Sequence, residues 1–324
     1  MLITMTLWGA LLIAIVALIR FAALNRLAKQ VFLILWALVL IRLLIPFAIP
    51  VSWIEMPPAS RIAAQAPLAP ALLNIGSDAA AAVPAGPAAP HRTGMDGAAA
   101  VTAADGGSLS LFNTLKVIWL SGLFLLAAYF LLIHVRSLRQ FRTSLPVDHP
   151  AVRAWLAAVP VRRKVQIRQS DRIHSPLTYG IWRPVILLPK SMEDADEEQF
   201  HHVLTHELVH IRRCDAVLKW LLAAAVCVHW FNPLVWLMFV LANRDIELSC
   251  DEAVVRRIGH HRKSAYARTL IRMVEARSKL TALYSGFSKN SIEERIIAIM
   301  KIRKTNVSAV VIVLALAVVT AVTF

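Results

Sequence analysis

His206, Glu207 and His210 form an HExxH pattern, which is the arrangement in this chain best suited to chemistry. The flanking sequence, from Phe200 to Arg213, is predicted to be one continuous helix, so the two imidazoles project from the same face. Two imidazoles placed in this way can bind one Zn²⁺, and the intervening Glu can take a proton from water at the metal's open position. Because the pattern is short and frequent by chance, the rest of the chain must support it.

A catalytic zinc needs a third protein ligand, and the best candidate is Glu247, which lies 37 positions after His210. Asp251 follows Glu247 at i+4, so one carboxylate can bind metal while the other accepts a hydrogen bond from a ligating imidazole. Asp215 is a second candidate for that outer role. The alternative is that Glu247, Asp251 and Glu252 form a solvated helix face, but the HExxH pattern favours the metal site.

The remaining histidines and a cysteine near these carboxylates are weaker candidates for ligands. His202 lies at i−4 from His206, but only the HExxH register encloses a Glu, so His201 and His202 are predicted to be ordinary helix residues. His229 lies in an apolar run, which favours a hydrogen-bonded core residue. Cys250 points about 300° around the helix from Glu247, which makes it a less direct ligand, and all three cysteines are predicted to be free thiols.

The composition predicts a membrane protein. Of the 324 residues 58% are hydrophobic and the mean hydropathy is +0.61, which is more apolar than a soluble domain of this size requires. The first span is predicted to be an uncleaved anchor. The predicted parts are two transmembrane helices in 1–54, a flexible Ala/Pro/Gly-rich extracytoplasmic loop over 55–110, a third span over 111–135, a cytoplasmic metallopeptidase domain over 136–306 and a fourth span over 307–324.

The basic residues predict the orientation in a bacterial cytoplasmic membrane. They cluster after the first and third spans and before the fourth, whereas the loop over 55–110 is nearly free of them. By the positive-inside rule, the N-terminus is then outside and the metal motif is inside. The net charge of +15 suits a surface that faces anionic lipid. No direct nucleic-acid partner is expected, because the basic residues are scattered and lack interleaved aromatics.

One further apolar segment, 217–241, is long enough to cross the membrane but is predicted to turn back. A single crossing would place Glu247 on the other side of the bilayer from His206 and would violate the charge rule. Asn232 and Pro233 lie near the middle of the segment, and proline breaks a helix there. We therefore expect a membrane-inserted helical hairpin, with a normal span of unusual topology as the alternative.

Two short runs before the metal motif, Val165–Gln169 and Pro184–Leu188, are predicted to be strands. The segment between them, 175–180, is rich in turn residues and is predicted to be a connection. Such a strand beside the His-bearing helix is well placed to bind an extended peptide by β-augmentation. The alternative is a small sheet that only shields the site.

Four segments together resemble the M56 family of membrane metallopeptidases, which includes the BlaR/MecR-type β-lactam sensor-transducers. They are His-Glu-Leu-Val-His at 206–210, His-Trp-Phe-Asn-Pro-Leu-Val-Trp at 229–236, Glu-Leu-Ser-Cys-Asp at 247–251, and Ser-Pro-Leu-Thr-Tyr-Gly at 175–180 followed by Arg-Pro-Val-Ile-Leu-Leu-Pro at 183–189. The resemblance extends from the first span to about residue 304. It implies a mainly α membrane protein with about four transmembrane helices, a gluzincin-like cytoplasmic domain with a small β-sheet, and the hairpin.

The resemblance also implies a zinc site in which His206, His210 and Glu247 are ligands and Glu207 is the base. It further implies proteolytic signalling in an antibiotic response, with a cytoplasmic protein such as a repressor, or the chain itself, as substrate. In the sensor-transducers a penicillin-binding domain follows the last span. No Ser-x-x-Lys motif of such a domain occurs here, so β-lactam sensing is not carried over.

Several finer expectations complete the prediction. Ser285, Gly286 and Phe287 lie in a segment, 283–288, that is predicted to be a loop and is a candidate for self-cleavage. The candidates for an additional oxyanion donor are Tyr179, Tyr266 and His260. The lipid bilayer is a partner, and a homodimer is one arrangement that the sequence leaves open.

Two other functions are compatible with the same sequence. The first is a non-catalytic membrane signal transducer with a structural or empty metal site, which would have no need of Glu207. The second is an ion or lipid transporter, based on Arg42 and the apolar content. It is weaker, because few other polar residues lie within the predicted spans.

Overall fold

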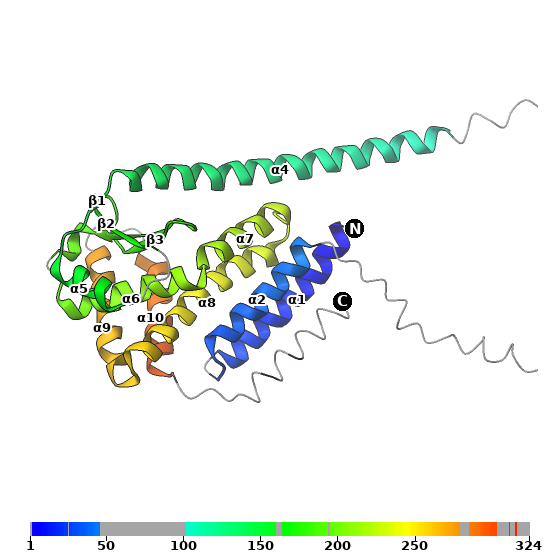
Figure 1. The fold of residues 1–324 in the computed structure, drawn as a ribbon. Helices are drawn as coiled ribbons and strands as arrows, with labels where there is room; N and C mark the ends of the chain where they lie inside the picture. The colour runs from blue at the N-terminus through cyan, green and yellow to red at the C-terminus, as the bar shows by residue number, and fades with distance from the viewer. Residues whose placement is uncertain are drawn as a thin grey trace, which may run out of the picture. The chain divides into compact units, whose positions relative to one another are not determined.

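The structure is a computed structural model that describes residues 2–24, 26–45, 102–159, 164–193, 195–278 and 285–302, with single positions 311 and 315. The chain divides into two units. One comprises residues 1–46 and 119–324, and the other residues 47–118. The described part of the second unit is 102–118, the beginning of one long helix. The first unit is mainly helical with a small mixed sheet and contains the candidate site (Figure 1).

Two described helices are long and apolar enough to cross a membrane. They lie at Thr4–Ala23, within α1 (Leu2–Ala23), and at Asn113–Arg142, within α4 (Thr102–Arg142). The predicted second span corresponds to α2 (Lys29–Leu44), which has 16 residues in the described part of the chain. Apart from positions 311 and 315, the predicted fourth span lies outside the described residues. The expectation of four transmembrane helices therefore stays a prediction.

The beginning of α4 corrects the predicted boundary of the Ala/Pro/Gly-rich loop. Residues 102–110 are helical and not part of a loop. Ala103 and Ala104 are strong helix formers, so the helix of the third span extends back toward the N-terminus through them. The rest of the predicted loop, 55–101, lies outside the described residues.

The predicted turn at Asn232 and Pro233 is present and joins two helices, α7 (Asp215–Val228) and α8 (Pro233–Ile258). The Asn232 side chain accepts a hydrogen bond of 2.9 Å from the Leu234 backbone N–H, and Pro233 occupies the first turn. Both features are typical of a helix start. Helix α8 has 26 residues, so the helix that begins at the turn also carries Glu247.

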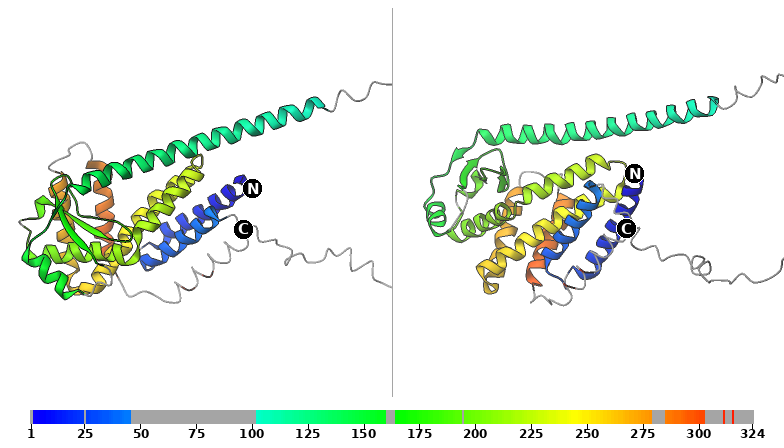
Figure 2. Two further views of the ribbon diagram at one scale, coloured as in Figure 1. Left: turned by 45° about the horizontal axis from the view of Figure 1, so that its top comes forward. Right: turned by 45° about the vertical axis from the view of Figure 1, so that its right-hand side comes forward.

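Helices α1, α2, α7 and α8 share one apolar core and lie side by side in Figures 1 and 2. Ile13, Phe32, Trp36, Leu222 and Met238 are fully buried in it. His229 is also fully buried and bonds through Nδ1 to the Thr6 hydroxyl and through Nε2 to the Leu43 carbonyl, as expected for a core histidine. The hairpin therefore packs on α1, the first candidate membrane helix.

The sheet has four strands in the order β1 (Leu145–Pro146), β2 (Gln166–Ser170), β4 (Val185–Pro189) and β3 (Leu177–Tyr179). The predicted strands correspond to β2 and β4 within one residue at each end, and they pair in parallel. The interpretation of 175–180 as a connection was wrong in part, because β3 forms there and pairs antiparallel with β4. Since β3 ends the sheet order, its outer edge pairs with no described strand.

Helix α6 (Glu197–Arg213) lies between this sheet and the remaining helices. On one side Leu204 packs with Ile186 and Leu188 of β4 and with Trp155 of α5 (Pro150–Ala158). On the other side Val209 packs in a second cluster with residues of α8, α9 (Lys263–Ser278) and α10 (Ser285–Met300). A short 3-10 helix, η2 (Lys190–Met192), precedes α6, and η3 (His260–Arg262) precedes α9.

The segment predicted to be a self-cleavage loop is helical from residue 285 onward. Ser285, Gly286 and Phe287 form the first turn of α10, and residues 279–284 lie outside the described part. The helix is fixed farther along, where Ile299 is fully buried among residues of α8 and α9. A peptide bond in this turn would have to leave the helix before a protease could bind it in extended form.

Candidate metal centre

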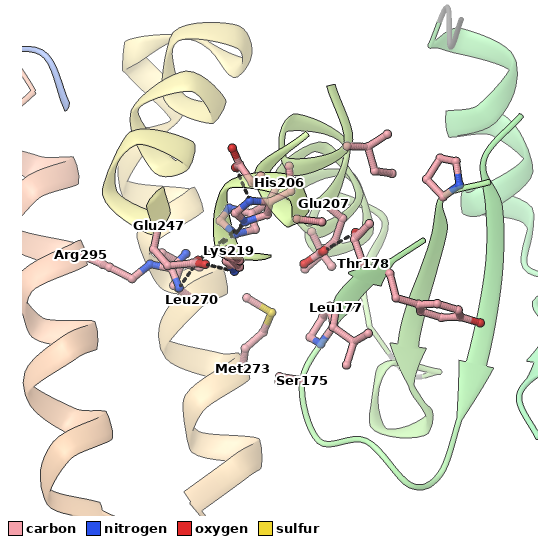
Figure 3. A pocket seen from close by; sticks show the side chains of 18 of the residues that line it. Ser175, Leu177, Thr178, His206, Glu207, Lys219, Glu247, Leu270, Met273 and Arg295 are labelled. Atoms are coloured by element: carbon pink, nitrogen blue, oxygen red, sulfur yellow. Dashed lines mark hydrogen bonds and ion pairs between the residues drawn. The ribbon is translucent and has the colours of Figure 1, made fainter. Parts of the chain in front are cut away.

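The two histidines of the HExxH pattern lie on one face of α6, and a carboxylate of α8 meets them. Nε2 of His206 and Nε2 of His210 are 3.2 Å apart. Oε2 of Glu247 lies 3.5 Å from the first and 3.8 Å from the second. Three ligands of a tetrahedral zinc lie roughly 3.3 Å from one another. These three atoms therefore have the separations that a single zinc ion requires (Figure 3).

The Nδ1 atoms of both imidazoles are hydrogen-bonded to other side chains, which leaves the Nε2 atoms free to bind a metal. Nδ1 of His210 lies 2.7 Å from Oδ2 of Asp215. Nδ1 of His206 lies 2.8 Å from the hydroxyl of Tyr266, which itself donates to Oδ1 of Asp251 at 2.7 Å. Since both outer partners accept, each Nδ1 carries the hydrogen, and each Nε2 keeps a lone pair for metal.

Cys250 is close to His206 but on the wrong side of the ring. Its Sγ lies 3.5 Å from Nδ1 of His206, and the three side chains His206, His210 and Cys250 could by distance alone hold a metal. However, Nδ1 of His206 is already bonded to Tyr266. Burial, and then the nearby Asp251 and Glu247 carboxylates, raise the pKa of the Cys250 thiol well above its usual range. Cys250 therefore lies on the Nδ1 side of His206, whereas Glu247 approaches both Nε2 atoms, and Glu247 fits the site better.

Charges around the site keep Glu247 ionised. Burial alone would raise its pKa, but His206, His210 and Arg295 outweigh burial and hold the pKa well below its ordinary range. Nη1 of Arg295 lies 3.6 Å from Oε2 of Glu247, and Nζ of Lys219 lies 3.5 Å from Oε1. A carboxylate ligand must be deprotonated to bind metal, so these neighbours favour the binding form.

The pKa of His210 is shifted in the opposite direction. Burial would lower it, but the hydrogen bond to Asp215 and the nearby carboxylates of Glu247 and Glu207 raise it above its ordinary value. Three carboxylates thus lie near a pair of imidazoles, and three basic side chains lie near two of these carboxylates. Two imidazoles with a carboxylate are a donor set that suits a divalent cation such as Zn²⁺.

Glu207 lies beside the histidines and faces a cavity of about 410 Å³. The Thr178 hydroxyl of β3 donates a hydrogen bond of 2.6 Å to Oε2 of Glu207. Figure 3 shows His206 and Glu247 on one side of the cavity and Leu177 and Thr178 on the other, with Met273 of α9 between them. The carboxylate is therefore oriented by the strand that forms the opposite wall.

The other histidines and tyrosines considered from the sequence are not among the three candidate ligands. Nδ1 of His202 is bonded to the Thr269 hydroxyl, and His201 is exposed on α6. Of the oxyanion candidates, Tyr179 packs against Phe141 in a tilted arrangement, with ring centroids 5.1 Å apart, and also lines the cavity. Tyr266 is committed to the outer side of His206, and His260 lies in the exposed turn η3.

Three contributors were not identified from the sequence as partners of the site, namely Thr178, Arg295 and the bridging hydroxyl of Tyr266. Arg295 donates two hydrogen bonds of 2.7 Å to Asp251, through Nε and Nη2. Asp251 was expected to bond directly to an imidazole. Its nearest approach to His206 Nδ1 is 3.4 Å, and the bond passes through Tyr266 instead.

Comparison with known proteins decides the family. The family model described as BlaR1 peptidase M56 matches residues 1–299 of this chain. The chain belongs to the M56 peptidase family. Membership supports a metallopeptidase, and the HExxH helix, the hairpin and the strand β3 all fall within the matched range.

Three M56 relatives illustrate the extent of the similarity. The regulatory protein BlaR1 of Bacillus licheniformis is 31% identical over 142 residues, which are 43% of this chain and 24% of that protein. The methicillin resistance mecR1 protein of Staphylococcus aureus (strain Mu50 / ATCC 700699) is 25% identical over 141 residues, 42% of this chain and 24% of that protein. The regulatory protein BlaR1 of Staphylococcus aureus is 22% identical over 166 residues, 50% and 28% respectively. The matches thus span about a quarter of each relative.

Proposed function

We propose that this M56 protein is a membrane-embedded zinc metalloendopeptidase that hydrolyses a cytoplasmic protein in transmembrane signalling. The observation that carries the proposal is the convergence of three donor atoms, Nε2 of His206, Nε2 of His210 and Oε2 of Glu247, beside a cavity that Glu207 faces. A structural zinc site is closed by four protein ligands, whereas a site with three ligands open to a cavity suits catalysis.

The residues around the cavity have distinct roles in peptide hydrolysis. Zinc held by His206, His210 and Glu247 would supply a Lewis acid and an acidified water. Glu207 takes the proton of the attacking water and then delivers it to the leaving amine. Thr178 holds the Glu207 carboxylate through its hydroxyl, and Asp215 and Tyr266 hold the two imidazoles in the tautomer with Nε2 free.

The substrate is proposed to bind as an extended segment along β3. The outer edge of β3 pairs with no described strand, and Leu177 and Thr178 of this strand line the cavity opposite the metal ligands. Backbone groups of a peptide can pair with such an edge in any sequence. Leu270 and Met273 line the same cavity and suit an apolar side chain next to the cleaved bond. The family resemblance suggests a repressor or the chain itself as substrate.

The site is proposed to face the cytoplasm, with the N-terminus outside and the α7–α8 hairpin inserted from the inner side. The apolar core that the hairpin shares with α1 supports insertion at the level of that helix. Thiol labelling of single cysteines introduced at Leu2 and at Arg26 tests the orientation in intact cells. An impermeant reagent should label the first position only, and labelling of the second position instead would reverse the topology.

The decisive experiment compares the wild type with Glu207→Gln in detergent-purified full-length chain. The wild type should hold about one zinc ion per chain and cleave a protein substrate, and the variant should keep the zinc but lose cleavage by at least roughly a hundredfold. His206→Ala is the control that should lose both. Retained cleavage in Glu207→Gln would exclude this residue as the base.

The same variants separate the peptidase from a non-catalytic transducer. In that second function the metal site is structural or empty, so Glu207→Gln would leave every downstream signal in cells unchanged. A signal abolished by both variants supports the peptidase. No zinc in folded wild type, even after supplementation, would contradict the metal centre and leave only the transducer.

A further inference from the structure

A second polar cluster lies on the opposite side of α8 from the metal centre. Nε of Arg20, in the last turn of α1, donates to Oδ1 of Asp245 at 2.8 Å, and its Nη2 donates to Oε1 of Glu294 at 2.8 Å. The other oxygen of Asp245 accepts from Trp36 of α2 at 2.7 Å. Arg20 and Asp245 are buried, and Asp245 has no solvent exposure at all.

This cluster bonds to two helices that also contribute side chains to the metal centre, α8 with Glu247 and α10 with Arg295. Asp245 and Glu247 are two residues apart on α8, so their side chains point about 200° apart around the helix. One therefore faces the membrane helices and the other faces the histidines. On α10 the neighbours Glu294 and Arg295 point about 100° apart around the helix. Glu294 reaches Arg20, and Arg295 reaches Glu247 and Asp251.

We propose that Arg20 is a positioning residue, which fixes α8 and α10 against each other so that Glu247 and Arg295 are held at the metal centre. The inference rests on the metal centre of the proposed function. Its physical basis is that one guanidinium forms two hydrogen bonds in a fixed fork geometry, to carboxylates of different helices. Without Arg20, the buried Asp245 carboxylate would lose its ion pair, and Glu294, which is 22% exposed, would keep the longer ion pair of 3.9 Å to Arg244 of α8, so the link between the two helices would weaken.

The cluster also links α1 to the metal centre through Asp245 of α8 and Glu294 of α10. Arg20 is at the cytoplasmic end of α1 in the proposed topology, where a cation is favoured by the helix dipole. If α1 shifted relative to α8, either the bonds of Arg20 to Asp245 and Glu294 would break, or both carboxylates would move with α1. The position of α1 thus affects the geometry of the proposed metal ligands through the Arg20 side chain.

The test compares Arg20→Gln with Thr6→Val in detergent-purified full-length chain. Thr6 makes another buried polar contact of α1, to His229 at 2.9 Å, but far along the helix from the centre. Zinc affinity, measured by competition with a chromophoric chelator, should fall roughly tenfold in Arg20→Gln, the low end for loss of an outer partner of a metal ligand. Thr6→Val should leave it unchanged, and Arg20→Lys should recover part of the loss.

A metal-free readout accompanies the affinity. Cys250 is fully buried, in a cluster that includes Ile299 of α10, so separation of α10 from α8 should expose it. Its labelling rate in the chelator-treated chain, followed by mass spectrometry, should rise several-fold in Arg20→Gln. Cys227 of α7 serves as the internal control and should keep its rate.

Each outcome decides the inference. Unchanged affinity and unchanged Cys250 labelling in folded Arg20→Gln would overturn it, as would an equal loss in Thr6→Val. If Arg20→Gln does not fold, Glu294→Gln replaces it, because that side chain is 22% exposed and the Arg20–Asp245 pair is left intact. If the wild type holds no zinc, the proposed function fails, and the labelling rates still decide whether Arg20 holds the two helices together.

Discussion

The hydroxyl of Tyr266 is interposed between His206 and the carboxylate of Asp251, and it lies 2.8 Å from Nδ1 of the imidazole. It accepts the Nδ1 hydrogen and passes its own hydrogen to Asp251. Arg295 in turn neutralises Asp251 through two bonds. The tautomer of His206, a proposed metal ligand, is therefore set by a chain of three side chains from three helices, α9, α8 and α10.

Removing the Tyr266 hydroxyl should weaken metal binding without creating a large cavity in the core. Tyr266→Phe keeps the ring, which is 1% exposed, but leaves Nδ1 of His206 without its acceptor at 2.8 Å. Zinc affinity should fall by roughly 10- to 100-fold, as is typical when the outer partner of a ligating histidine is lost. Competition titration with a chelator measures the change.

The same pair of helices offers a matched control for Tyr266→Phe. Thr269 of α9 bonds to Nδ1 of His202 on α6 at 2.9 Å, and His202 has no place among the proposed ligands. Thr269→Val removes an equivalent hydroxyl and should leave zinc affinity within about twofold of the wild type. Equal losses in the two variants would show that general packing between α6 and α9, not the tautomer of His206, controls binding.

Glu247 and Cys250 can be distinguished as ligands by one pair of substitutions. Glu247→Gln removes the carboxylate that lies 3.5 Å from Nε2 of His206 and should reduce zinc from about one per chain to a small fraction. Cys250→Ala removes the thiol on the Nδ1 side and should leave the zinc content unchanged. Metal analysis of both purified variants gives the answer, and the reverse pattern would assign Cys250 as the third ligand.

Thr178 should affect the rate of cleavage more than substrate binding. Its hydroxyl donates to Glu207 at 2.6 Å, so Thr178→Val leaves the base free to rotate away from the attacking water. We expect kcat to fall by roughly tenfold, which is less than the full contribution of a general base to the rate. KM should change much less than kcat. Thr178→Ser keeps the hydroxyl and should retain activity. A change confined to KM would instead place Thr178 among the groups that only bind substrate.

The parts of the site that could be predicted from the sequence are those in which the residues lie close together along the chain. His206 and His210 are four residues apart on one helix, so the period of the helix alone brings their side chains to one face, with Glu207 next to them in the sequence. Asn232 and Pro233 carry the start signal of α8 in their own residue types. Glu247 depended on an additional argument, because only the hairpin brings α8 back beside α6.

The remaining parts depend on contacts between distant segments. Strand β3 contains Pro176 before it and Gly180 after it, and these residues indicate a turn locally, whereas pairing with β4 makes 177–179 a strand. Tyr266 and Arg295 lie 60 and 89 positions beyond His206, and no period of helix or strand relates them to it. Only the packing of α9 and α10 on α8 shows that both residues support the centre.

Asp196 should make the start of the His-bearing helix sensitive to acid. Its carboxylate caps α6 by accepting the Gln199 backbone N–H at 2.7 Å, and this bond, with Arg272, lowers the pKa of Asp196 below its ordinary value of 3.8. A carboxyl with a lowered pKa in the folded state stabilises the helix above its unfolded pKa. The contribution is lost as the pH falls through the lower, folded value.

Hydrogen exchange of the peptide that spans the first turn of α6 measures this effect. At pH 6 to 7, Asp196→Ala should lose about 1 kcal/mol of local protection, a roughly fivefold faster exchange after correction for the intrinsic rate. The difference from the wild type should persist down to about pH 4 and shrink below it. Asp196→Asn keeps a capping side chain that does not titrate and should stay near wild type at neutral pH. A difference for Asp196→Ala that is unchanged at pH 3 would show that the carboxylate is not the cap.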